Sequence, residues 1–139
     1  MQEYYEIVQN GFRVLHPLLA GYVAQEMRRN YKDQWWDEIL LALSDQYGLP
    51  DSGEYGDLVD SLDIANCLRV IDRRWRDVFS EKFSKSHRNW ASELMEVRNR
   101  AAHIGLEDFK QSYAERALDT MALLCESIDI TDRGNKIII

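Results

Sequence analysis

The apolar residues of this chain recur every three or four positions along most of its length, and this spacing constrains the fold more than any other feature. An α-helix has about 3.6 residues per turn, so residues spaced in this way share one face that can be buried. The cleanest such face is formed by Phe109, Tyr113, Ala117, Met121, Leu124 and Ile128. Strand-like alternation is absent, and only seven glycines and two prolines interrupt the 139 residues. The pattern predicts an all-α fold, an antiparallel bundle of four or five helices.

The helix ends follow from the residues that start and stop helices. We expect helices over residues 5–30, 33–47, 61–79, 86–103 and 107–129. Pro17 should kink or restart the first of them, because proline breaks the hydrogen bonding of a helix interior. Asp33 should cap the second, and one of Trp35 and Trp36 should point away from the core, because adjacent helical residues diverge by about 100°. Gly105 should end the fourth helix.

The length of the chain suits one domain with a substantial core. We assign residues 1–130 to a single helical domain, because Asp132-Arg133-Gly134 should break the last helix. Residues 131–139 are then expected to be a tail, or the start of a linker to a region that follows. No apolar run approaches the roughly 18 residues of a membrane span, and no signal peptide opens the chain, so we expect a cytoplasmic protein that does not enter a membrane.

The charge of the chain is unevenly distributed. The formal net charge of −7 argues against a general nucleic-acid coat protein. Between residues 69 and 103, however, there are nine Lys and Arg residues and five acidic residues, which gives this segment a net charge of +4. Arg69, Arg73 and Arg76 have helical spacing within it and are candidates for an RNA track. The alternative is a solvated helix face on which these arginines pair with Asp72 and Asp77.

The same segment ends in the run Arg98-Asn99-Arg100-Ala101-Ala102-His103. Asn99 and His103 are four residues apart and share a helix face, whereas Arg98 lies about 140° around the helix from His103. Arginine grips phosphate through a planar fork of donors, its long stem could reach towards the same phosphate, and histidine can carry a proton near neutral pH. These residue types suit the cutting of RNA without a metal. Alternatively, His103 caps its helix and Arg98 pairs with Glu93 or Glu96.

Other catalytic arrangements are missing from the sequence. There is no glycine-rich phosphate loop, no Cys/His metal spacing and no nucleophile elbow, so we expect neither a metal nor a cofactor. Cys67 and Cys125 are too few for a disulfide framework and lie in apolar helical stretches, which favours buried thiols.

Two runs resemble the HEPN family (higher eukaryotes and prokaryotes nucleotide-binding). They are Glu96-Val97-Arg98-Asn99-Arg100-Ala101-Ala102-His103 and Ala114-Glu115-Arg116-Ala117-Leu118-Asp119-Thr120-Met121. The closest likeness is to the branch first described in a eukaryotic RNA-surveillance endonuclease, which in bacteria often precedes ATPase or defence-linked regions. The resemblance extends from about residue 5 to residue 129.

This resemblance implies a four- to five-helix bundle, usually paired as a homodimer, that acts on RNA or a nucleotide. It implies a metal-independent endoribonuclease in which Arg98 binds the phosphate, Asn99 has a positioning role and His103 transfers protons. Arg100 would add to the basic surface. Gly105 stands where some toxin members carry a modified tyrosine, so that antitoxin mechanism is not expected. The alternatives are a non-catalytic module that binds RNA or nucleotide within a larger protein, and a plain helical dimerisation domain.

Overall fold

The computed structural model describes the backbone of residues 1–138 and the side chains of residues 1–128. Throughout the described backbone the regular elements are helices, and the predicted all-α bundle is confirmed. The α-helices are α1 (Glu3–Tyr31), α2 (Trp35–Ala42), α3 (Tyr55–Asp60), α4 (Ile64–Arg73), α5 (Lys85–His103) and α6 (Gln111–Ile138). Two 3₁₀ turns, η1 (Lys32–Gln34) and η2 (Phe79–Glu81), lie between them.

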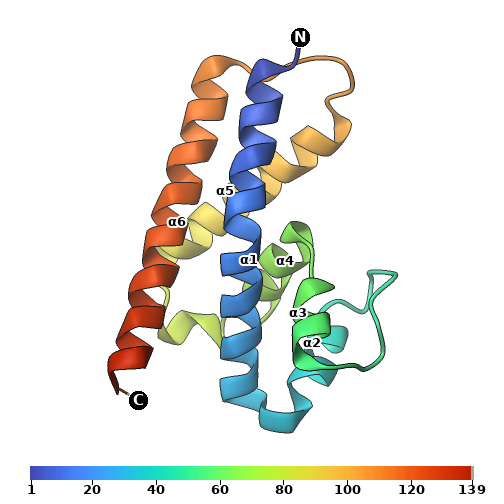
Figure 1. The fold of residues 1–139 in the computed structure, drawn as a ribbon, viewed down its shortest axis with the longest axis vertical. Coiled ribbons are helices and arrows are strands. Elements are labelled where there is room, and N and C mark those ends of the chain that lie inside the picture. Colours follow the sequence, from blue (N-terminus) through green and yellow to red (C-terminus); the bar gives the residue numbers. More distant parts are fainter. Residues whose placement is uncertain (139) are drawn as a thin grey trace.

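The long helices α1 and α6 pack side by side and run in the same direction, whereas α5 runs back against α6 (Figure 1). Their contact is close at Gly11, where an added Cβ would lie 2.7 Å from Met121 Sδ and 2.8 Å from Leu118 Cδ2. Helix α4 packs on both α1 and α5, so the core lies between these four helices. Its largest fully buried side chains include Leu15, Leu19, Ile71, Leu94 and Leu124.

Helix α1 is longer and more regular than the sequence indicated. It continues through Pro17 without the expected restart. Pro17 is exposed, so the carbonyl that loses its helical partner can turn towards water. Among the helices of the described residues, none combines the length and apolar character needed to cross a membrane.

The region after α1 corrects two predictions. Asp33 does not cap a helix, because it lies inside the η1 turn, and α2 begins at Trp35 without a side-chain cap. Trp35 and Trp36 are both buried, with 8% and 5% of their surface exposed. The segment after α2 folds back over this helix: the Trp36 indole donates to the Pro50 carbonyl (3.0 Å), and the Trp35 ring lies 5.3 Å from that of Tyr55. The face of α2 that was expected to point away from the core is therefore covered by α3 and by the loop before α3. The spacing of apolar residues does not reveal this cover.

The predicted helix over 61–79 is instead α4, which spans only Ile64–Arg73. Asp63 caps it by accepting a hydrogen bond from the Asn66 N–H (2.7 Å). Turns and η2 follow, and Trp75 is half-buried among them. The last helix also differs, because α6 passes Asp132-Arg133-Gly134 without the expected break and continues to Ile138. Ile139 lies outside the described residues, so the division at residue 130 stays a prediction.

Candidate functional site

The motif residues occupy the last turns of α5, and both ends of this helix are fixed. At the start, Ser84 and His87 form a capping box, in which the Ser84 N–H donates to His87 Nδ1 (2.9 Å). At the end, Gly105 has a φ of +66°, a left-handed conformation that glycine adopts at little cost. His103 is the last residue of the helix, and its side chain is exposed.

A hollow of about 440 Å³ lies beside His103. Arg100 and Lys110 bring positive charge to its wall, and Glu107 and Asp108 bring negative charge. The Arg100 guanidinium lies 5.0 Å from the centre of the Tyr113 ring and 3.5 Å from a Glu96 carboxylate oxygen. The hollow thus combines an imidazole with two cations at a surface that solvent can reach.

The loop after His103 is tied to the beginning of α1. The Asp108 carboxylate accepts hydrogen bonds from the backbone N–H groups of Tyr4 (3.1 Å), Tyr5 (2.7 Å) and Phe109 (2.8 Å). Burial alone would raise the pKa of Asp108, but these three hydrogen bonds outweigh it and lower the pKa. Gln2 adds hydrogen bonds of 2.7 Å to the carbonyls of Gly105 and Glu107. Asp108 thus caps the first turn of α1, where Tyr4 lies 104 residues earlier in the chain, a role for which the local sequence gives no signal.

Arg98 and Asn99 lie beside each other rather than beside the hollow. Arg98 Nη1 is 3.5 Å from Asn99 Oδ1, and Arg98 is not among the residues that line the His103 hollow. The predicted pairing of Arg98 with Glu93 or Glu96 is absent from the described residues, because Arg116 binds Glu93 (2.7 Å) and Arg100 binds Glu96. Within one copy, the structure places Arg100 next to His103 and leaves Arg98 on another face.

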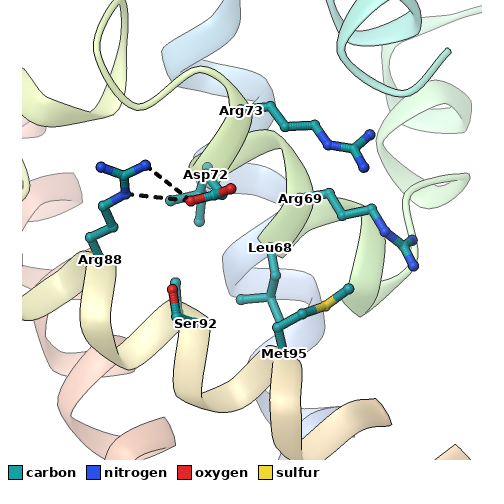
Figure 2. A pocket seen from close by; sticks show the side chains of 9 residues that line it. Leu68, Arg69, Asp72, Arg73, Arg88, Ser92 and Met95 are labelled. Atoms are coloured by element: carbon teal, nitrogen blue, oxygen red, sulfur yellow. Dashed lines mark hydrogen bonds and ion pairs between the residues drawn. The ribbon is translucent and has the colours of Figure 1, made fainter. Parts of the chain in front are cut away.

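The predicted basic track is divided by the structure. Arg69 and Arg73 line a groove between α4 and α5 (Figure 2). Arg76 is exposed and is not among the residues that line this groove. Neither Asp72 nor Asp77 pairs with these three arginines in the described part of the chain. Arg73 instead forms two hydrogen bonds with Asp45 (2.6 and 3.0 Å), and they lower the pKa of Asp45 to about 2.

Two other ionisable side chains, those of Glu26 and Cys67, are buried in the interior. Burial raises the pKa of the Glu26 carboxyl, although it lies 3.0 Å from Lys82 Nζ and 3.7 Å from an Arg29 guanidinium nitrogen. Cys67 is buried as predicted, and burial raises the pKa of its thiol, while Cys125 is only half-buried. In the described residues, no group of His, Cys, Asp and Glu side chains is arranged to hold a metal ion.

The comparison with protein families found a match that covers most of the chain. The model of one protein family, described as Swt1-like HEPN, matches residues 10–129, which is most of the sequence. This span includes every residue of α5 and the motif at its end. No curated protein and no solved structure matches the chain.

Proposed function

Because the chain belongs to the Swt1-like HEPN family, we propose that it binds RNA and cleaves it without a metal, acting as a homodimer. The observation that carries the proposal is the end of α5. There His103 is exposed beside Arg100 and Lys110, one helical turn from Asn99. A proton carrier next to fixed cations is the minimum that RNA cleavage of this kind requires.

In the proposed reaction the ribose 2′-OH attacks the adjacent phosphorus, and the bond from phosphorus to the 5′-oxygen breaks. The products are a 2′,3′-cyclic phosphate and a 5′-OH end. His103 makes one of the two proton transfers, from the 2′-OH or to the leaving 5′-oxygen, and water makes the other. Arg98 and Arg100 stabilise the charge that develops on the phosphate oxygens, and Asn99 holds Arg98 in position.

The positions of Arg98 and His103 favour pairing of two copies. Five residues along a helix correspond to a rotation of about 140°, so one α5 cannot easily direct both side chains at one phosphate. A two-fold axis near the end of α5 would bring the Arg98 of each copy towards the His103 of the other. Arg69, Arg73 and Arg76 would then hold flanking phosphates.

A second function, binding of RNA or a nucleotide without cleavage, is favoured by the same separation of Arg98 from His103 and by the net charge of −7. In that case the module would bring a larger protein to RNA. Phosphate contacts release counterions, so binding in either case should weaken steeply as the salt concentration rises.

The test is to incubate the purified protein with structured and single-stranded RNA in excess EDTA and to identify the product ends. We expect cutting with 5′-OH ends, slower by at least about 100-fold in His103→Ala because a general acid–base group contributes roughly 10²–10⁴ in rate. Asn89→Ala, at an exposed position of the same helix, should cut like the unmodified protein. If the protein bound RNA without cutting it, the nuclease would be excluded and the second function, binding without cleavage, would remain. If it did not bind RNA, both functions would be contradicted.

A further inference from the structure

A groove of about 280 Å³ separates α4 from α5, and its lining on α5 runs from Arg88 to Met95, less than one helical turn before Arg98. Leu68, Ile71, Ala91 and Met95 make its walls apolar. Polar groups stand around this apolar part: Arg69 and Asp72 on α4, and Arg88 and Ser92 on α5 (Figure 2). We propose that this groove takes one unstacked base of a single-stranded RNA. This proposal rests on the function proposed above, and it assigns a binding subsite to one base of the RNA substrate.

The lining suits a nucleobase. A flat ring gains dispersion energy against aliphatic side chains, and the polarisable thioether of Met95 makes favourable contacts with aromatic rings. The edge of a base needs hydrogen-bonding partners, which the Asp72 carboxylate and the Ser92 hydroxyl supply as an acceptor and as a donor or acceptor. RNA is commonly read in this way, through splayed bases of single strands rather than through the deep groove of a duplex.

The charges around the groove suit the phosphate of the same nucleotide. Arg73 is held by Asp45, and Arg88 is held by Asp72 at 3.2 Å while lying 5.4 Å from the centre of the Trp75 ring. Arg69 binds only the neutral amide of Asn66 (2.8 Å) and has no carboxylate partner among the described residues. Its positive charge is therefore uncompensated, and it is the group from which a phosphate would gain most.

The groove is continuous with the motif along α5. Ala91, Met95 and Arg98 follow at spacings of four and three, so they share one helix face. From Met95 to Arg98 the helix rises only about 4.5 Å. A strand whose phosphate lies on Arg98 would therefore bring the base of a neighbouring nucleotide to the groove. The occupant is accordingly a base close to the cleaved bond, which makes the groove a determinant of sequence preference.

The test compares two exposed serines of α5. Ser92→Leu fills the groove without changing the charge, and Ser86→Leu makes the same change outside it. Each is introduced into the full chain with His103→Ala, so that RNA stays intact. Affinities are measured for a series of short single-stranded RNA oligonucleotides, each lacking the base at one position. Met95→Ala provides a second variant that enlarges the groove rather than filling it.

With Ser86→Leu, we expect that removing the base at one position weakens binding about five- to tenfold, at the low end of what stacking on a side chain provides. With Ser92→Leu and Met95→Ala this position should lose its effect, while removal of the other bases gives the same result in every variant. RNA binding in which no position depends on Ser92 or Met95 would overturn the base site and leave the proposed function intact. If none of the proteins bound RNA, the base site and the proposed function would both be wrong.

Discussion

His87 joins three parts of the molecule through one imidazole ring. Its Nδ1 accepts from the Ser84 N–H, and its Nε2 lies 2.9 Å from the Ser127 hydroxyl on α6. The ring stacks on Phe83 at 4.6 Å and meets Trp90 at 5.0 Å. The hydrogen bond to Nδ1 assigns the proton of the neutral ring to Nε2. Partial burial lowers the pKa of His87 below its ordinary value of 6.5.

Stability should therefore depend on the protonation of His87. Because its folded-state pKa is lowered, the unfolded chain binds the proton first as the pH falls. The stabilising effect is complete above about pH 6.5 and is lost as the pH falls through that value towards the lowered pKa. His87→Gln keeps a side chain that can complete the capping box but does not titrate.

The melting temperature of His87→Gln should consequently fall less between about pH 7.5 and pH 5.5 than that of the unmodified protein. Thermal unfolding followed by circular dichroism measures both curves. Parallel curves would show that His87 does not contribute to the pH dependence.

Single residues also show what the sequence could and could not reveal. The exposed position of His103 at the end of a helix stopped by Gly105 could be predicted, because both signals are local. The partner of Arg73 could not, since Asp45 lies 28 residues away on the other side of two turns and a short helix. Likewise, the Asp108 contacts depend on where two distant chain segments meet.

The close packing of α1 against α6 depends on a glycine, Gly11, which has no side chain at the point of contact. At Gly11 an added methyl group would meet Met121, which is buried and has little room to move, whereas at Gly21 of the same helix nothing lies within 4 Å. Alanine favours a helix over glycine by up to about 1 kcal/mol, and overpacking a core costs about 1–3 kcal/mol. These two substitutions therefore have opposite expected effects within one helix.

Gly21→Ala should raise the free energy of unfolding by about 0.5–1 kcal/mol. Gly11→Ala should lower it by about 1 kcal/mol, because the steric cost exceeds the gain in helix propensity. Urea unfolding of both variants beside the unmodified protein gives the two values. Equal stabilisation by both alanines would mean that α1 and α6 can separate at Gly11 without loss.

The long helices could be predicted from periodicity, and their ends could not. Helices α1, α5 and α6 have apolar faces of several turns, so their existence follows from spacing alone. Helix α3 has six residues and one buried side chain, Leu58, which is too little to form a periodic pattern. The apolar spacing predicts a helix up to residue 79, because Trp75 and Val78 continue the pattern of α4, although the chain leaves the helix after Arg73.

The whole molecule carries its two motif side chains on different faces, and this allows a test of pairing. Arg98→Ala and His103→Ala, each of which the proposed mechanism makes inactive, are mixed in the unfolded state and refolded together, so that mixed pairs form. If each site combines Arg98 of one copy with His103 of the other, a mixed pair contains one intact site. Random pairing then restores about a quarter of the unmodified activity.

If both residues acted from the same copy, the mixture would be as inactive as its components. RNA cleavage by the mixture, with each variant refolded alone as the control, distinguishes the two cases. The mass of the refolded protein in solution shows whether pairs form at all.

The packing of the first long helix against the last sets the order in which the protein can be completed during its synthesis. Val8, Phe12 and Leu15 are made well before the helix that covers this side of α1, which begins only at Gln111. At roughly 5–20 residues per second, α1 waits for several seconds with apolar surface uncovered. The last turn of α5 is also translated before α6 can support it. The motif is therefore synthesised before the helix that supports α5, and the finished arrangement depends on α6, which is made after α1 and α5.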